Sequence, residues 1–208
     1  MKILVLDFGI GNVGSIRSMY RKIGYQVIVS GQADAISEAS HFILPGVGAF
    51  DTGIKRMKES DGFNELCRQV LEFKKPLLGI CLGMQLLTQR SEEGVEKGLG
   101  WIDGETKRFD FSKINFASKA LKIPHMRWNE IEASESDPLL GGYEQTPRFY
   151  FVHSYHVCCN NSQESIATTV HGIKFTSCIR RDNVMGVQFH PEKSHRYGLK
   201  VLENFARL

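Results

Sequence analysis

The sequence has no long hydrophobic run, although 42% of its 208 residues are hydrophobic. The apolar stretch at residues 3–6 stops at Asp7, which is too short for a signal peptide or a membrane span. An excess of charge of one sign is also missing, because 26 Lys and Arg residues face 23 Asp and Glu residues. A formal net charge of +3 without a basic stripe gives no reason to expect a nucleic acid or a membrane as partner.

The sequence has few cysteines, and they form no framework. Five cysteines are an odd number, and neither a Cys-x-x-Cys pair nor a His/Cys ligand cluster is present, so we expect no metal site. Unpaired thiols are typical of a reducing compartment, and we therefore expect a cytoplasmic protein. Linkers, internal repeats and low-complexity segments are also missing from the sequence. Residues 1–208 are accordingly predicted to be one domain.

Short apolar segments alternate with helical patterns in the first half of the chain. Strands are predicted at residues 3–6, 27–29, 42–44 and 76–80, and helices at 12–23, 33–39, 51–73 and 83–89. This βαβ order predicts a mostly parallel sheet. Alternating segments in the second half, such as 148–152 and 165–170, predict antiparallel strands added to that sheet or packed beside it. Residues 91–98 and 110–120 have the composition of loops.

Residues 9–14 match the G-x-G-x-x-G pattern between a predicted strand and a predicted helix. A dinucleotide site of this kind also needs an acidic residue after the second strand, and residues 27–31 end without one. We therefore interpret the glycines as a tight turn between strand and helix and expect no cofactor.

Cys81 stands in a G-x-C-x-G segment at residues 79–83, between a predicted strand and a predicted helix. Glycines two residues either side of a nucleophile relieve crowding in a sharp strand-to-helix turn. The positive end of the following helix would favour the thiolate, the reactive form of cysteine. The alternative is a buried structural cysteine, which is the common fate of this residue in a core strand. The flanking glycines favour a nucleophile.

A thiolate that transfers acyl groups needs a base and a group that orients the base. The apolar segment at residues 186–189 leads into His190, Pro191 and Glu192. Proline restricts its own backbone and that of the residue before it, so the Glu192 carboxylate is predicted to meet the His190 ring. The alternative is a structural histidine. A structural or surface role is also what we assume for His41, His125, His156, His171 and His195.

The glycine-rich loop at residues 44–50 is predicted at the same edge of the sheet as Cys81. Backbone N–H groups of this loop, together with that of Leu82, are where we expect the donors of an oxyanion hole.

Together these segments resemble the class I (triad) glutamine amidotransferases, and within them the amidotransferase subunits of imidazole glycerol phosphate synthase. The resemblance covers nearly the whole chain and rests on ordered blocks at residues 7–12, 44–50, 79–87, 124–126, 128–129, 151–155 and 186–194. It implies a flavodoxin-like α/β fold, with helices on both faces of the sheet and antiparallel strands added in the C-terminal half.

The resemblance also implies roles for single residues. Cys81, His190 and Glu192 correspond to the triad, and Gly48 and Leu82 to the oxyanion region. Positions near bound glutamine correspond to Gln85, His153 and Ser154. Family members pass ammonia to a (β/α)8-barrel cyclase subunit in a heterodimer, and the positions that face this partner correspond to Asn12, Trp128, Tyr150 and Lys193.

One residue departs from the family pattern, which usually has glycine where this chain has Arg127. Arginine adds a long cation beside the predicted interface. Paralogous amidotransferases supply ammonia for amidated surface sugars of bacteria, and Arg127 keeps that pathway open as an alternative to histidine biosynthesis.

Two further classes of protein compete with a glutaminase that works in a complex. A small cysteine peptidase would act alone and would not need Gln85, His153 or Ser154 to suit glutamine. A binding subunit without activity is disfavoured, because nucleophile, base and acid are all present in the sequence.

Overall fold

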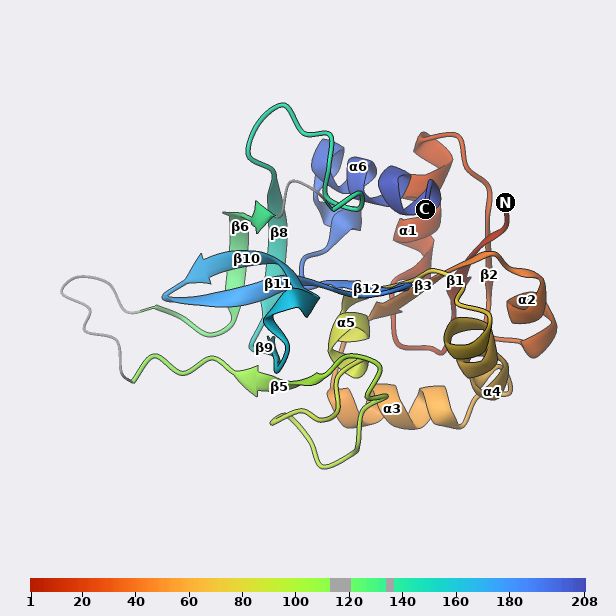
Figure 1. The fold of residues 1–208 in the computed structure, drawn as a ribbon, viewed down its shortest axis with the longest axis horizontal. Helices are drawn as coiled ribbons and strands as arrows, with labels where there is room; N and C mark the ends of the chain where they lie inside the picture. Colours follow the sequence, from red (N-terminus) through yellow and green to blue (C-terminus); the bar gives the residue numbers. More distant parts are fainter. Residues whose placement is uncertain (113–120, 134–136) are drawn as a thin grey trace.

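The fold is built around a ten-stranded sheet with a second, two-stranded sheet beside it. The computed structural model describes residues 1–112, 121–133 and 137–208. The strand order of the large sheet is β2-β1-β3-β4-β12-β11-β10-β7. In addition, β9 pairs with β11, and β5 pairs with β9. Neighbours from β2 to β12 are parallel, and β11 is antiparallel to β12. The mostly parallel sheet with helices around it is the predicted α/β fold (Figure 1).

The first half of the chain alternates strands and helices, as predicted. The strands are β1 (Ile3–Leu6), β2 (Val27–Ser30), β3 (His41–Gly46) and β4 (Leu77–Cys81). The helices are α1 (Val13–Lys22), α2 (Ala33–Glu38), α3 (Phe50–Lys58), α4 (Phe63–Cys67), the π-helical turn η1 (Arg68–Glu72) and α5 (Leu82–Leu86).

The second half is mainly β-structure. Its strands are β5 (Gly104–Arg108), β6 (His125–Glu130), β7 (Glu132–Ala133), β8 (Arg148–His153), β9 (Tyr155–Cys159), β10 (Ser165–His171), β11 (Ile173–Arg181) and β12 (Val184–Val187). The helical elements are the 3₁₀ turns η2 (Ser162–Glu164) and η3 (Pro191–Lys193) and helix α6 (His195–Ala206). Strands β6 and β8 pair with each other in the small sheet, so the segment around residues 148–152 packs beside the main sheet.

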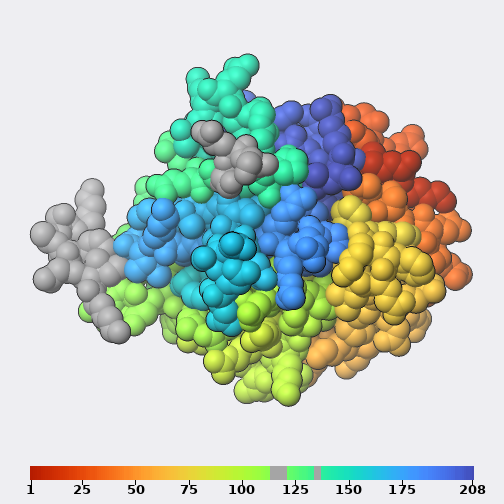
Figure 2. All heavy atoms as spheres, in the orientation of Figure 1, coloured from red at the N-terminus to blue at the C-terminus, as the bar shows by residue number. Residues whose placement is uncertain are grey.

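Alternation along β1 creates a core on each face of the large sheet. Ile3 and Val5 pack with α1 and α6, whereas Leu4 and Leu6 pack with α2, α3 and α4. Figure 1 shows these two groups of helices on opposite sides of the sheet. In Figure 2 the C-terminal segment lies against the N-terminal one, and Tyr20 of α1 donates a hydrogen bond to the Leu202 carbonyl of α6 at 3.1 Å. Helices α1 and α6, which lie near the two ends of the chain, therefore cover the same face of the large sheet.

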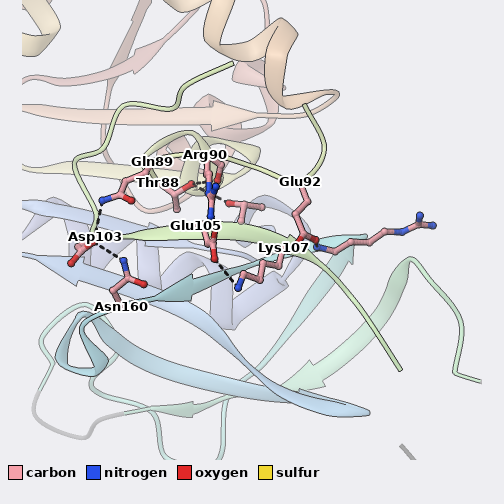
Figure 3. Close-up of polar contacts among 10 residues, drawn as sticks. Thr88, Gln89, Arg90, Glu92, Asp103, Glu105, Lys107 and Asn160 are labelled. Carbon is pink, nitrogen blue, oxygen red and sulfur yellow. Dashed lines mark hydrogen bonds and ion pairs between the residues drawn. The ribbon is translucent and has the colours of Figure 1, made fainter. Parts of the chain in front are cut away.

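A polar network holds β5 to the loop that follows α5. Glu105 bonds Arg90 and Lys107 at 2.7 Å each, while Asp103 accepts from Gln89 and Asn160 (Figure 3). These contacts hold Gln89 and Arg90, which lead into the predicted loop at residues 91–98, against β5 at the edge of the sheet. Among the described residues, no helix is long and apolar enough to cross a membrane.

Two helix predictions were wrong in their extent. The helix predicted over residues 51–73 ends at Lys58 and resumes at Phe63. In the turn between them Gly62 packs so closely on the Gly31 carbonyl of the neighbouring loop that a side chain at this position would overlap it. Helix α5 ends at Leu86, where the chain turns toward β5. In the predicted loop at 110–120, residues 113–120 lie outside the described part of the chain.

Candidate active site

Cys81 is the last residue of β4 and directly precedes α5, with a φ of 55°. This left-handed backbone is strained for a residue with a side chain. A Cβ on Gly79 would lie 2.7 Å from the carbonyl oxygen of Gly83, and one on Gly83 would overlap the carbonyl oxygen of Leu44. Glycine at both positions therefore allows the sharp turn, which holds Cys81 at the carboxyl edge of the parallel strands.

His190 and Glu192 meet across the proline between them. Pro191 opens the turn η3, and His190 Nδ1 lies 2.7 Å from Glu192 Oε1. The backbone N–H of His190 donates to the Tyr150 carbonyl at 2.9 Å, and its carbonyl accepts from Ser194 Oγ at 2.6 Å. Strand β12 ends at Val187, so this anchoring to β8, rather than a continuing strand, positions the histidine.

The imidazole of His190 is buried, with 2% of its surface exposed. Burial alone lowers the pKa of His190, but hydrogen bonds to Cys81 and Glu192 outweigh burial and raise this pKa to about 9. Since Glu192 occupies Nδ1, Nε2 is the ring nitrogen that faces the thiol. A histidine that stays protonated at neutral pH can stabilise a thiolate and later give up its proton.

A cavity of about 320 Å³ opens over Cys81 and suits a ligand of amino-acid size. Most of the site residues predicted from the sequence line it, namely Gly48, Cys81, Leu82, Gln85, His153, Ser154, His190 and Lys193. Gly48 has a φ of 101° and free space around its Cα, so its loop can present backbone N–H groups to a ligand.

Gln85 and His153 are less free to bind a ligand than the sequence indicates. The amide nitrogen of Gln85 donates to the Tyr155 carbonyl at 3.1 Å and to Gln188 Oε1 at 3.0 Å, which leaves its oxygen for a ligand. His153 Nδ1 donates to the same carbonyl at 2.7 Å, and its Nε2 contacts His125 Nδ1 at 3.0 Å. His153 therefore shapes the cavity wall with both ring nitrogens engaged inside the protein.

The neighbouring histidines are structural. His125, His156 and His171 pack around Phe109 in an aromatic cluster, and burial lowers the pKa of His125 to about 3. In a neutral ring, Nδ1 of His125 can donate to His153 while its Nε2 accepts from the amide of Asn129. Among the described residues, no group of three or more His, Cys, Asp or Glu side chains could hold a metal ion.

Three of the residues expected at a partner interface form one surface cluster, which we call the Trp128 cluster: Trp128, Tyr150 and Lys193, joined by His195. Trp128 is 37% exposed and stacks on His195 with ring centroids 5.5 Å apart. It faces Tyr150 across the β6–β8 pair, and Lys193 lies over the Tyr150 ring. An aromatic side chain so exposed belongs to the surface and not to the core.

Arg127 and Asn12 are placed differently. Alternation along β6 puts Arg127 on the face of His125 and Asn129, opposite to Trp128. Burial is the main cause that lowers the pKa values of His125 and His171, and the charge of Arg127 is a smaller one, which for His125 also ranks after the charge of His171. Asn12 caps α1, accepting from the backbone N–H of Ser15 at 3.1 Å. Arg127 thus lies beside the Trp128 cluster in sequence but on the other side of the strand.

Gln188 is the residue of the site that sequence reasoning missed. It is completely buried, and its amide nitrogen lies 3.7 Å from Cys81 Sγ. A polar residue between the apolar Val187 and Phe189 was the available signal. The glycines at residues 9–14 also have a local explanation, since a Cβ on Gly11 would lie 2.6 Å from Pro45 Cβ.

Comparison with known proteins shows the family of the chain. Residues 4–208 match the family model for class I glutamine amidotransferases. The chain is 47% identical over 205 residues to imidazole glycerol phosphate synthase subunit HisH 2 of Methanococcus maripaludis, covering 99% of this chain and 98% of that protein. It is 42% identical over 206 residues to the subunit of the same name from Pseudomonas aeruginosa, with 99% of each chain covered.

Among solved structures, PurLQS from Thermotoga maritima superposes with a TM-score of 0.72 at 17% identity, covering 99% of this chain and 97% of that one. At this identity the likeness shows the fold alone. The family model and the high identities along nearly the whole chain show more: the chain belongs to the class I glutamine amidotransferases, among the HisH subunits of imidazole glycerol phosphate synthase.

Proposed function

We propose that this chain hydrolyses glutamine to glutamate and ammonia through Cys81, His190 and Glu192, and passes the ammonia to a synthase subunit in histidine biosynthesis. The observation that supports this best is the buried ion pair of His190 and Glu192 beside a cysteine at a strained turn, with Cys81 and His190 lining one cavity. Membership of the family supports the choice of glutamine as substrate.

In the first half of the reaction, the Cys81 thiolate attacks the carbon of the side-chain amide. Backbone N–H groups near Gly48 and Leu82 stabilise the oxyanion. His190 gives its proton to the departing nitrogen, so that the C–N bond breaks, ammonia leaves and a γ-glutamyl thioester remains.

In the second half, water attacks the thioester and His190 takes its proton. The C–S bond breaks, glutamate leaves, and the thiolate and the imidazolium are restored. Glu192 orients the ring throughout and stabilises its charged form. The proton balance closes without any further group.

The partner that we propose is a (β/α)8-barrel cyclase subunit, bound as a heterodimer. HisH relatives are named as subunits of imidazole glycerol phosphate synthase, which supports an obligatory partner. The Trp128 cluster is exposed and ends in Lys193, which also lines the cavity over Cys81. A partner seated on this cluster would therefore lie beside the cavity that releases ammonia.

A second candidate keeps the same chemistry but changes the acceptor to a bacterial surface sugar. The observation in its favour is Arg127, an exposed cation on β6 where the family usually has glycine. A synthase with a matching acidic surface would suit this position.

The first test is to measure glutamate release from glutamine with and without a histidine-pathway cyclase loaded with its nucleotide ligand. Cys81→Ala is expected to lower turnover by at least roughly 10³-fold. Cys67→Ala is the matched control, because Cys67 lies in α4 away from the cavity.

Strong stimulation by the cyclase would support the histidine pathway. Activity that needs Cys81 but ignores the cyclase would favour the surface-sugar partner. Glutaminase activity that survives in Cys81→Ala would refute the nucleophile.

A further inference from the structure

Gln188 joins the nucleophile to the interior of the protein. Its side chain is completely buried two positions before His190, and its backbone N–H donates to the Ser177 carbonyl at 2.8 Å. The side-chain amide reaches Cys81 on one side, with 3.7 Å from Nε2 to Sγ, and Gln85 on the other. It thereby links β12 with the turn between β4 and α5.

The orientation of this amide follows from its neighbours. The Tyr155 carbonyl can only accept hydrogen bonds, so the group of Gln85 that lies 3.1 Å from it is the NH₂ group. That same nitrogen lies 3.0 Å from Gln188, whose facing atom must then be the acceptor Oε1. The NH₂ group of Gln188 is consequently left to face Cys81.

The Tyr155 carbonyl is itself held in place. It also accepts from His153 Nδ1 at 2.7 Å, so both of its lone pairs are used. His153 Nε2 in turn contacts His125, whose other ring nitrogen lies 3.3 Å from the amide of Asn129. A reversal of either glutamine amide would place two acceptors or two donors in contact within the buried site.

We propose that Gln188 is a positioning residue that stabilises the Cys81 thiolate by donating a hydrogen bond to it, with its orientation fixed through Gln85 by the Tyr155 carbonyl. This inference rests on the proposed function in taking Cys81 as the nucleophile. It assigns Gln85 a second role beside glutamine binding, because Gln85 transmits the orientation.

A neutral donor matters here because the thiolate is partly withdrawn from water. Cys81 is 8% exposed, and a buried anion needs hydrogen-bond donors to persist. The titratable groups that share the cavity with it are Glu93, His153, Tyr155, His190 and Lys193. Of these, His190 hydrogen-bonds to Cys81 and supplies the countercharge, and Gln188 adds a donor that keeps its orientation at every pH.

The experiment measures the alkylation rate of Cys81 by iodoacetamide from pH 5.5 to 9.5 by peptide mass spectrometry on the full chain. Each cysteine-containing peptide is quantified separately, so alkylation of Cys81 is distinguished from that of the other thiols. One of these is Cys159, where burial raises the pKa to about 12. Gln188→Leu is expected to move the midpoint of Cys81 alkylation upward by about one pH unit, which is an about tenfold lower rate at pH values well below the midpoint.

Gln188→Met is a second variant that fills the same space without a donor, in case leucine disturbs the fold, and it is expected to shift the midpoint equally. Gln69→Leu is the matched control, because Gln69 is also a buried glutamine but donates to Glu65 in α4. It is expected to leave the Cys81 midpoint unchanged. Thermal unfolding of each variant verifies that it is folded.

If folded Gln188→Met shows an unchanged midpoint of Cys81 alkylation, even with lower activity, Gln188 contributes only packing and the inference is overturned. The proposed function fails in a different way, namely if complete alkylation of Cys81 leaves glutamine hydrolysis intact. The two results come from separate measurements, so each can be read without the other.

Discussion

The pair of His190 and Glu192 determines how single residues of the site respond to pH. The side chains of His190 and Glu192 are 3% and 5% exposed, and Nδ1 of the histidine lies 2.7 Å from Oε1 of the glutamate. Because the folded protein raises the pKa of His190 to about 9, protonated His190 stabilises the fold. This contribution is complete below the unfolded pKa of about 6.5 and is lost as the pH rises through 9.

We therefore expect Glu192→Gln to flatten the pH dependence of stability as well as to impair catalysis. Between pH 6.5 and 9.5, the free energy of unfolding of the wild type should fall further than that of the variant, by on the order of 1–2 kcal/mol. Urea unfolding at a series of pH values measures this difference.

The same variant should lower kcat more than it raises KM, since Glu192 acts on the base rather than on glutamine. Glu203→Gln is a matched control on α6, where the carboxylate bonds only surface cations. Equal pH slopes for the wild type and Glu192→Gln would show that the carboxylate does not support the protonated ring.

At the scale of elements, the turn from β4 to α5 depends on close backbone contact with β3. Gly83 packs against the carbonyl of Leu44 in β3, and Gly46 at the end of β3 also packs against Gly83. The short distance between these elements holds Cys81 and the loop of Gly48 at one edge of the sheet. Any side chain at the contact must push β3 and α5 apart.

Gly83→Ala is expected to destabilise the protein by about 2–4 kcal/mol and to lower the alkylation rate of Cys81, because the turn must open. Gly14→Ala is the matched control, since it lies in α1 with no heavy atom nearer than 3.9 Å to the added Cβ. It should be neutral or stabilising by about 0.5–1 kcal/mol. Equal thermal shifts in both variants would contradict a tight contact at Gly83.

At the scale of the whole molecule, the small β6–β8 sheet separates two surfaces. Trp128 and Tyr150 lie on one face of this sheet, and Arg127 follows the opposite face with His125 and Asn129. The cavity over Cys81 includes Val152 and His153 of β8. An assembly contact on the small sheet would therefore lie on a strand that also forms a wall of the cavity.

Trp128→Ala should weaken binding of the cyclase subunit by roughly 30-fold, while glutamine hydrolysis without partner stays unchanged. Titration calorimetry and glutamate release measure the two quantities. Phe73→Ala is the matched control, being an exposed aromatic after the turn η1 whose ring contacts Arg68. Unchanged affinity in Trp128→Ala would make this residue a surface packing partner of His195.

The sequence by itself determined the parallel sheet and the main candidates for the site. Strands such as Leu77–Cys81 have continuous apolar runs, and the glycines around Cys81 indicate a sharp turn. Both signals can be recognised in the sequence because each lies within a few consecutive residues. The proline between His190 and Glu192 is a local constraint of the same kind. Contacts between residues near each other in sequence could therefore be predicted from propensity and spacing.

Only the tertiary structure decided which side chains meet across the sheet. Gln188 contacts Cys81 and Gln85, residues 107 and 103 positions away, so no local pattern could indicate its donor role. The close packing of Gly62 on Gly31, in the turn that follows the end of α3 at Lys58, likewise joins segments far apart in the chain. Packing between distant segments fixes such contacts and the direction of each hydrogen bond, and that information appears only when the chain has folded.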